Sequence, residues 1–245
     1  MNETLKEDMH YVISRLPKSV VEIMKKFNLY LSGGFIRSII SGEKPSDIDL
    51  FGKNEGIIIE AVDYLTKYKW SDSAHITKTD NAFTIISVGR LPVQFITRWL
   101  YDDPVKLINE FDFTITQAVI WFSHTESYSN NQNEQIDSYK PYSICSPFFY
   151  SDLAAKRLRY TSPDRKEDAG GSILRVVKFL RRGYNIAPED LSKVICQLLK
   201  GVKDNVDLRD KYLCKILTGL MREVDPLRLV DGCEVNTEMT HNEIE

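Results

Sequence analysis

The first 27 residues show the spacing of apolar side chains that is typical of amphipathic helices. The positions that recur every three or four residues are Leu5, Met9, Val12, Ile13 and Leu16. Pro17 interrupts this pattern, and Ser19 is expected to cap a second helix that ends near Phe27. Two helices are therefore predicted ahead of the first strand.

A short strand, a tight turn and a short helix are predicted next. The apolar residues 29–31 lead into Gly33 and Gly34, and a helix pattern follows over residues 35–41. Glycine has no Cβ, so the backbone can bend sharply here and an anionic ligand can approach it closely. The helix after the turn points free N–H groups at such a ligand. The stretch therefore predicts a phosphate-binding turn.

Two aspartates begin the following strand. Asp47 and Asp49 flank Ile48 in a second apolar run, and side chains in a strand alternate between its two faces. Both carboxylates therefore share one face, where they repel each other unless a cation lies between them. A hard cation such as Mg²⁺ takes oxygen ligands and often brings substrate phosphates with it. The turn and the aspartate pair together supply the parts needed for phosphoryl or nucleotidyl transfer.

The middle of the chain predicts more sheet. Asn54 is expected to cap the next helix, and a strand is expected around residues 75–77. Two β-rich runs, residues 82–88 and 91–96, are separated by a glycine and an arginine and predict a hairpin. A short helix is predicted over residues 103–110.

The second half of the chain is mainly helical in pattern. The polar residues 124–146 are expected to form a loop or a loose hairpin. Further helices are predicted over residues 149–158, 172–182, 188–200 and 208–223. The second of these is expected to begin at Ser172 as its cap and to stop at Gly183. Its buried face is expected to consist of Ile173, Val176, Val177 and Leu180.

These elements predict an α+β fold: a small mixed sheet with flanking helices, followed by an all-helical region. The expected domains are a catalytic head over residues 1–147, a helical neck with C-terminal helices over residues 148–231, and an acidic, disordered tail over residues 232–245.

The composition, 42% hydrophobic and 27% charged, is ordinary for a globular protein. No membrane span and no secretory signal are evident, and the four cysteines are widely spaced. A cytoplasmic protein with reduced thiols is therefore expected.

The charge is unevenly distributed. The net charge is −3, but residues 152–182 hold nine basic and four acidic side chains. A local basic patch on an acidic protein suits a polyanionic ligand that meets one face. The residues expected to contact an RNA backbone are Lys156, Arg157, Arg159, Lys178 and Arg182.

Gly33-Gly34-x-x-Arg37, followed about ten residues later by Asp47-x-Asp49, resembles the signature of the polymerase-β-type nucleotidyltransferase superfamily. The resemblance is to the head and neck of bacterial-type tRNA CCA-adding enzymes and poly(A) polymerases. It implies catalysis with two Mg²⁺ ions, or Mn²⁺, bound by the two aspartates. It also implies a triphosphate held by Ser32, Gly33 and Gly34 with help from Arg37.

Other segments of the chain match the superfamily only in part. In the superfamily a third acidic residue often follows the hairpin turn, but here that strand has no carboxylate and Gln94 is the nearest polar candidate. Arg98 resembles an arginine that the family keeps after this strand and is assigned to the nucleotide. Residues 111–117 resemble the family's Arg-Arg-Asp-Phe-Thr-x-Asn motif at Asp112 and Thr114, whereas both arginines are replaced.

The segment over residues 167–184 resembles the neck from which these enzymes select the incoming base with an aspartate and an arginine. Asp168 and Arg175 are the candidates for those roles, and Asp112 is assigned to the nucleotide sugar. The alternative is that the basic residues of this segment form the solvated face of a helix.

Three functions remain open from the sequence. The first is template-independent transfer of a nucleotide from ATP or CTP, or from both, to an RNA 3′ end, with tRNA or a tRNA-like RNA as the expected acceptor. The second keeps the chemistry but modifies a hydroxyl of a protein or small molecule, as toxin or resistance relatives do. The third is a non-catalytic RNA-binding relative. Neither the oligomeric state nor the number of nucleotides added follows from the sequence.

Overall fold

The computed structural model describes residues 1–70, 74–128, 135–163, 170–201 and 206–224. The chain divides into two compact units. Unit 1 comprises Met1–Asn109 and Thr116–Phe149, and unit 2 comprises Glu110–Ile115 and Tyr150–Glu245. The predicted α+β class is confirmed, and no helix within the described ranges is long and apolar enough to cross a membrane.

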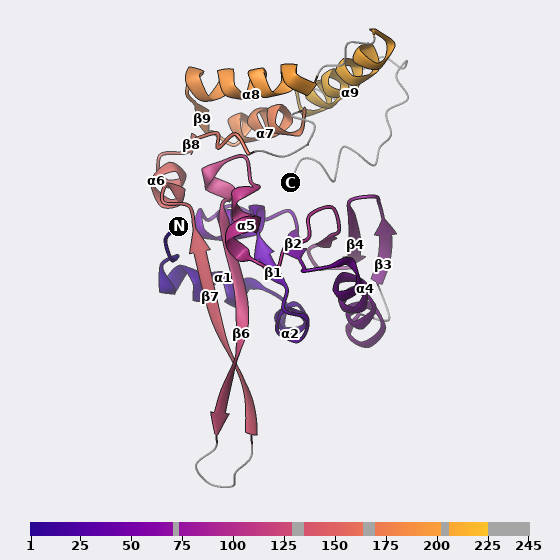
Figure 1. Cartoon of the computed structure of the whole chain (residues 1–245), viewed down its shortest axis with the longest axis vertical. Helices are drawn as coiled ribbons and strands as arrows, with labels where there is room; N and C mark the ends of the chain where they lie inside the picture. Colours follow the sequence, from indigo (N-terminus) through magenta and orange to yellow (C-terminus); the bar gives the residue numbers. More distant parts are fainter. Residues whose placement is uncertain (71–73, 129–134, 164–169, 202–205, 225–245) are drawn as a thin grey trace. The chain divides into compact units, whose positions relative to one another are not determined.

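Unit 1 is built on a sheet whose strand order, among the described residues, is β3-β4-β5-β2-β1-β6-β7 (Figure 1). The strands are β1 (Tyr30–Ser32), β2 (Ile48–Phe51), β3 (Ala74–Lys78), β4 (Ala82–Ser87), β5 (Val93–Ile96), β6 (Ala118–Tyr128) and β7 (Gln135–Cys145). β2 and β5 are parallel, whereas the other neighbours are antiparallel. The sheet is therefore mixed, and the predicted hairpin is present as β4 and β5.

Alternation along the central strands gives the sheet one apolar face. Leu31, Leu50 and Phe95 lie side by side on β1, β2 and β5, and all three are completely buried. The helices of unit 1 are α1 (Lys6–Arg15), α2 (Lys18–Phe27), α3 (Gly34–Ile40), α4 (Glu55–Tyr64) and α5 (Pro104–Asn109). Among them α2 packs against β6, α3 against β2 and α4 against β5.

The helix ends follow the sequence signals in part. Asn54 caps α4 as predicted, because its side chain accepts a hydrogen bond from the backbone N–H of Ile57. The prediction that Ser19 caps α2 is wrong. Pro17 occupies the cap position, and the hydroxyl of Ser19 instead accepts a hydrogen bond from the indole N–H of Trp70 at 3.0 Å. A π-helical turn, η1 (Leu65–Lys69), continues α4.

The polar stretch expected to be a loop or loose hairpin is a long, regular hairpin. β6 and β7 pair continuously from Ala118 opposite Cys145 outward. Cross-strand aromatic contacts support this pairing, since Trp121 stacks on Tyr142 with ring centroids 5.9 Å apart. Such cross-strand pairs stabilise a β-ribbon.

Unit 2 is mainly helical. Its elements, with α6 spanning the boundary between the units, are α6 (Phe149–Ala154), β8 (Arg157–Leu158), α7 (Gly170–Arg181), β9 (Asn185–Ile186), α8 (Pro188–Gly201) and α9 (Val206–Val224). The helix predicted over residues 149–158 stops at Ala154. The reason is that Lys156 adopts a left-handed conformation with φ of 48°, and the next two residues pair with β9.

The start and buried face of α7 differ from the prediction. The helix begins at Gly170, so Ser172 lies inside it and is not its cap. Leu174, Val176 and Phe179 are buried, whereas Leu180 is 45% exposed. Aromatic packing sets this orientation, because the ring of Phe179 contacts those of Phe113 and Tyr184 with centroids 6.2 and 5.3 Å apart. The predicted stop at Gly183 is confirmed by its φ of 82°.

The aromatic cluster of unit 2 predicts a large effect of its central ring. Phe113 is completely buried and contacts both Tyr160 and Phe179, so Phe113→Ala should lower the free energy of unfolding of this unit by about 3–5 kcal/mol. Urea denaturation followed by circular dichroism measures the loss. Leu180→Ala, at an exposed apolar position of the same unit, is the control and should change stability by less than about 1 kcal/mol. Equal effects of the two substitutions would contradict this packing.

Candidate active site

The glycine turn and the two aspartates lie at the same end of the central strands. β1 and β2 are antiparallel, with Leu31 opposite Leu50. Continued by one residue, this register sets Ser32 opposite Asp49. The turn that follows β1 therefore lies beside the start of β2, and Asp47 is two residues before Asp49 on the same face. The structure thus brings together the two motifs that the sequence predicted to work together.

Gln94 completes this polar group. In the parallel pairing of β2 with β5, Gln94 lies directly beside Asp49. Its side-chain Nε2 donates a hydrogen bond to Oδ2 of Asp47 at 3.3 Å, and the hydroxyl of Ser46 donates to Oδ1 at 3.1 Å. Asp47, Asp49 and Gln94 are 5%, 4% and 6% exposed. Two carboxylates and an amide are therefore almost fully enclosed on one face of the sheet.

The two glycines contribute in different ways. Gly33 has φ of 82° and ψ of −138°, a conformation that residues with a Cβ adopt only under strain. Gly34 is the first residue of α3, and a Cβ added there would meet no atom within 4 Å. Open space therefore lies over the start of α3. The hydroxyl of Ser32 is used within the sheet, where it donates to the carbonyl of Ala118 at 2.6 Å.

The arginines assigned to the nucleotide in unit 1 occupy contrasting positions. Arg37 is 2% exposed and forms an ion pair with Glu43, which lies in the loop between α3 and β2. Arg37 also donates to the hydroxyl of Ser38 at 2.9 Å. It thereby ties α3 to the loop that leads into the aspartates. Arg98 is exposed directly after β5.

In unit 2 the structure brings Asp112 and Arg175 together. Both are buried, and Nε of Arg175 donates to Oδ2 of Asp112 at 2.8 Å. The hydroxyl of Ser172 donates to the same oxygen at 2.8 Å. The segment around Asp112 is held further by its backbone carbonyl, which accepts a hydrogen bond from the N–H of Thr161 at 2.8 Å. Asp168 lies outside the described residues.

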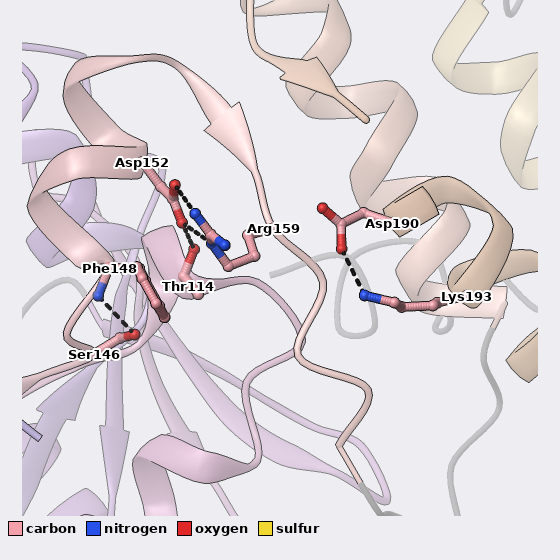
Figure 2. Close-up of polar contacts among 7 residues, drawn as sticks. All are labelled: Thr114, Ser146, Phe148, Asp152, Arg159, Asp190 and Lys193. Atoms are coloured by element: carbon pink, nitrogen blue, oxygen red, sulfur yellow. Dashed lines mark hydrogen bonds and ion pairs between the residues drawn. The ribbon is translucent and has the colours of Figure 1, made fainter. Parts of the chain in front are cut away.

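A second buried carboxylate in unit 2 was not among the predicted site residues. Figure 2 shows the carboxylate of Asp152, on α6, joined by dashed lines to both Thr114 and Arg159. Thr114 donates to it at 2.7 Å, and Arg159 donates through two nitrogens at 2.8 and 3.2 Å. The hydrogen bonds from Arg159 to Asp152 raise the pKa of Arg159 above its ordinary value. One feature of the sequence indicates that Asp152 is buried: it lies between the apolar residues Phe149 and Leu153 on one short helix.

The five side chains assigned to RNA differ in their exposure. Lys156 and Arg157 are exposed, whereas Lys178 and Arg182 are half-buried. Arg159 is 31% exposed and engaged with Asp152. Among the described cations of the patch, the exposed ones therefore lie before and at the start of β8, at Lys156 and Arg157, and at the end of α7, at Arg181.

The Asp47–Asp49 pair fits a hard divalent cation. Its two carboxylates are enclosed and share a face, and carboxylate oxygens are the ligands that Mg²⁺ and Mn²⁺ prefer. Within the part of the chain that the structure describes, no group of three or more His, Cys, Asp or Glu side chains is placed to bind a metal ion. The candidate metal site is therefore a two-carboxylate site with a neutral amide beside it.

The mixed sheet, with the glycine turn beside the aspartate pair, has the polymerase-β-type nucleotidyltransferase fold. Solved structures agree. A Thermotoga maritima CCA-adding enzyme complexed with tRNA matches with a TM-score of 0.55 and 19% identity over 96% of this chain and 53% of that one. A CCA-adding enzyme with CTP matches with a TM-score of 0.52 and 18% identity, over 89% and 52% of the two chains. At these identities the likeness shows the fold.

The chain belongs to the Gabija anti-defense 2 family, whose model matches residues 3–156. A relative described as Gabija anti-defense 2, from Bacillus phage SPbetaL7, is 21% identical over 180 residues. That match covers 74% of this chain and 40% of the phage protein. The chain therefore spans less than half of this relative and about half of the matched enzyme structures.

The turn geometry predicts opposite effects of adding a methyl group at adjacent glycines. Gly33→Ala should lower the free energy of unfolding by about 1–3 kcal/mol, because its backbone conformation is strained for alanine. Gly34→Ala, the matched control, should leave stability unchanged or raise it by up to about 1 kcal/mol, since it fills open space in a helix. Urea denaturation of both variants checks this. Equal losses would show that the turn does not have this conformation.

Proposed function

We propose that this protein transfers a nucleoside monophosphate from an NTP to a hydroxyl acceptor, at a site centred on Asp47 and Asp49. The observation that supports this most directly is their enclosure on one sheet face beside the glycine turn. Neighbours with the same fold are enzymes bound to CTP, ATP or tRNA.

Each residue has a definite task in this proposal. Asp47 and Asp49 would hold two Mg²⁺ ions, and Mn²⁺ could replace them. When bound, the ions would activate the attacking hydroxyl and offset the charge of the departing pyrophosphate. The turn at Gly33 and Gly34 receives the triphosphate in the open space at the start of α3. Arg37 acts indirectly, by fixing the loop between the turn and the aspartates through Glu43. No covalent intermediate is required.

The first candidate acceptor is an RNA 3′ end, with a tRNA or tRNA-like molecule as the expected substrate. Two observations support it. The fold is that of CCA-adding enzymes, and Lys156 and Arg157 present exposed positive charge. Any contribution of Asp112 and Arg175 to nucleotide binding would then be made as a pair, because they bind each other within unit 2.

The second candidate acceptor is a hydroxyl on a component of the defence against which the family acts. The family's description as an anti-defense protein favours this reading. A further observation favours it too: Arg159 and Arg175, two of the basic residues near the neck, bind carboxylates within unit 2. Fewer cations are then available for an RNA backbone than the sequence alone indicates.

Labelled NTPs should distinguish these acceptors. The purified protein is incubated with Mg²⁺ and each NTP, and with total RNA and total protein from a bacterium that has the defence. We expect label in one macromolecular fraction with the wild-type protein. The Asp47→Asn, Asp49→Asn double variant should lose at least about 1000-fold in transfer, since metal ions contribute several kcal/mol to such reactions.

The control is Asp63→Ala, which removes a half-exposed surface carboxylate of α4 and should keep full activity. Label in RNA supports the first acceptor, and label in protein supports the second. Retention of anti-defense activity by the double variant, with no transfer by the wild-type protein, would show a non-catalytic binding protein instead.

A further inference from the structure

We propose that Gln94 is a positioning residue that orients Asp47 and sets the metal affinity of a two-carboxylate site. The inference rests on the proposed function, because it concerns the same aspartate pair.

The geometry places Gln94 against both aspartates. Its backbone is in register with Asp49 across the parallel pair of β2 and β5, so adjacent strands bring the two side chains to the same face about 5 Å apart. Its amide reaches the other aspartate, since Nε2 lies 3.3 Å from Oδ2 of Asp47. A single side chain therefore lies beside one carboxylate and hydrogen-bonds to the other.

Burial strengthens the hydrogen bond between Gln94 and Asp47. Gln94 and Asp47 are 6% and 5% exposed, and hydrogen bonds to a charged acceptor are strong where water is largely excluded. With Ser46 donating to Oδ1, both oxygens of Asp47 accept hydrogen bonds. The plane of the carboxylate is thereby fixed before any ion arrives. Partners that orient a metal ligand in this way commonly change metal affinity by 10- to 100-fold when they are removed.

The neutrality of Gln94 has a second consequence. A carboxylate at this position would add a third negative charge to the enclosed group, and it could not donate a hydrogen bond to Asp47. Like charges at this spacing raise the free energy of the metal-free protein and favour cation binding. Glutamine therefore gives a metal-free site with less repulsion and a weaker affinity for divalent ions than an acid would give.

Mn²⁺ binding to the nucleotide-free full chain tests the inference directly. Free Mn²⁺ is measured by electron paramagnetic resonance during titration of the wild-type protein and of Gln94→Glu, Gln94→Leu, Thr84→Val and the Asp47→Asn, Asp49→Asn double variant. Thr84 is the matched control, because it is paired with Gln94 on β4 and is half-buried.

We expect Gln94→Leu to bind Mn²⁺ about tenfold more weakly than the wild type, and Gln94→Glu to bind about tenfold more tightly. Thr84→Val should match the wild type. The melting temperature adds a second readout: Gln94→Glu should melt below the wild type without metal and gain more from added Mn²⁺. A purely structural role would lower the melting temperature of both Gln94 variants without tightening Mn²⁺ binding in either.

Two other results would overturn the inference, and the Mn²⁺ binding of the double variant distinguishes them. If the double variant loses Mn²⁺ binding while both Gln94 variants match the wild type, Gln94 does not position the site, although the proposed metal site stands. If the double variant binds Mn²⁺ as tightly as the wild type, the metal site itself is absent and the proposed function fails as well.

Discussion

The register between β1, β2 and β5 is the constraint on which the candidate site depends. It sets Leu31, Leu50 and Phe95 in one fully buried row, and burial of each such side chain contributes about 1.5–3 kcal/mol. A slip of one residue would turn these side chains to the opposite face. Core packing therefore keeps Asp49 and Gln94 adjacent on the other face, even though grouping buried polar side chains is unfavourable by itself.

Several features were predictable because their signals are local. The glycine turn, the short helix and the aspartate pair lie within 20 residues, so backbone preference and strand alternation are enough to place them. Their proximity across the sheet then follows from the antiparallel pairing of β1 with β2. Gln94 could be named as the nearest polar candidate on its strand, but its hydrogen bond to Asp47 depends on the parallel pairing of β2 with β5.

The features that could not be predicted depend on contacts between distant residues. Arg175 is held by Asp112, 63 positions earlier, and no local pattern in either segment indicates this pairing. The buried side of α7 follows aromatic packing with Phe113, which no periodicity within the helix reveals. The long hairpin of β6 and β7 is stabilised by cross-strand pairs such as Trp121 with Tyr142, which the local sequence pattern does not reveal. In each case tertiary packing overrides the local pattern.

We propose that the enclosed aspartate pair binds divalent ions beside a turn that receives a triphosphate. A crystal of the full chain grown with Mn²⁺ and a non-hydrolysable NTP, with anomalous diffraction recorded for manganese, tests it most directly. We expect manganese peaks within coordinating distance of Asp47 and Asp49, with the triphosphate against Gly33 and Gly34. Manganese or nucleotide bound elsewhere, with these four residues unoccupied, would contradict it.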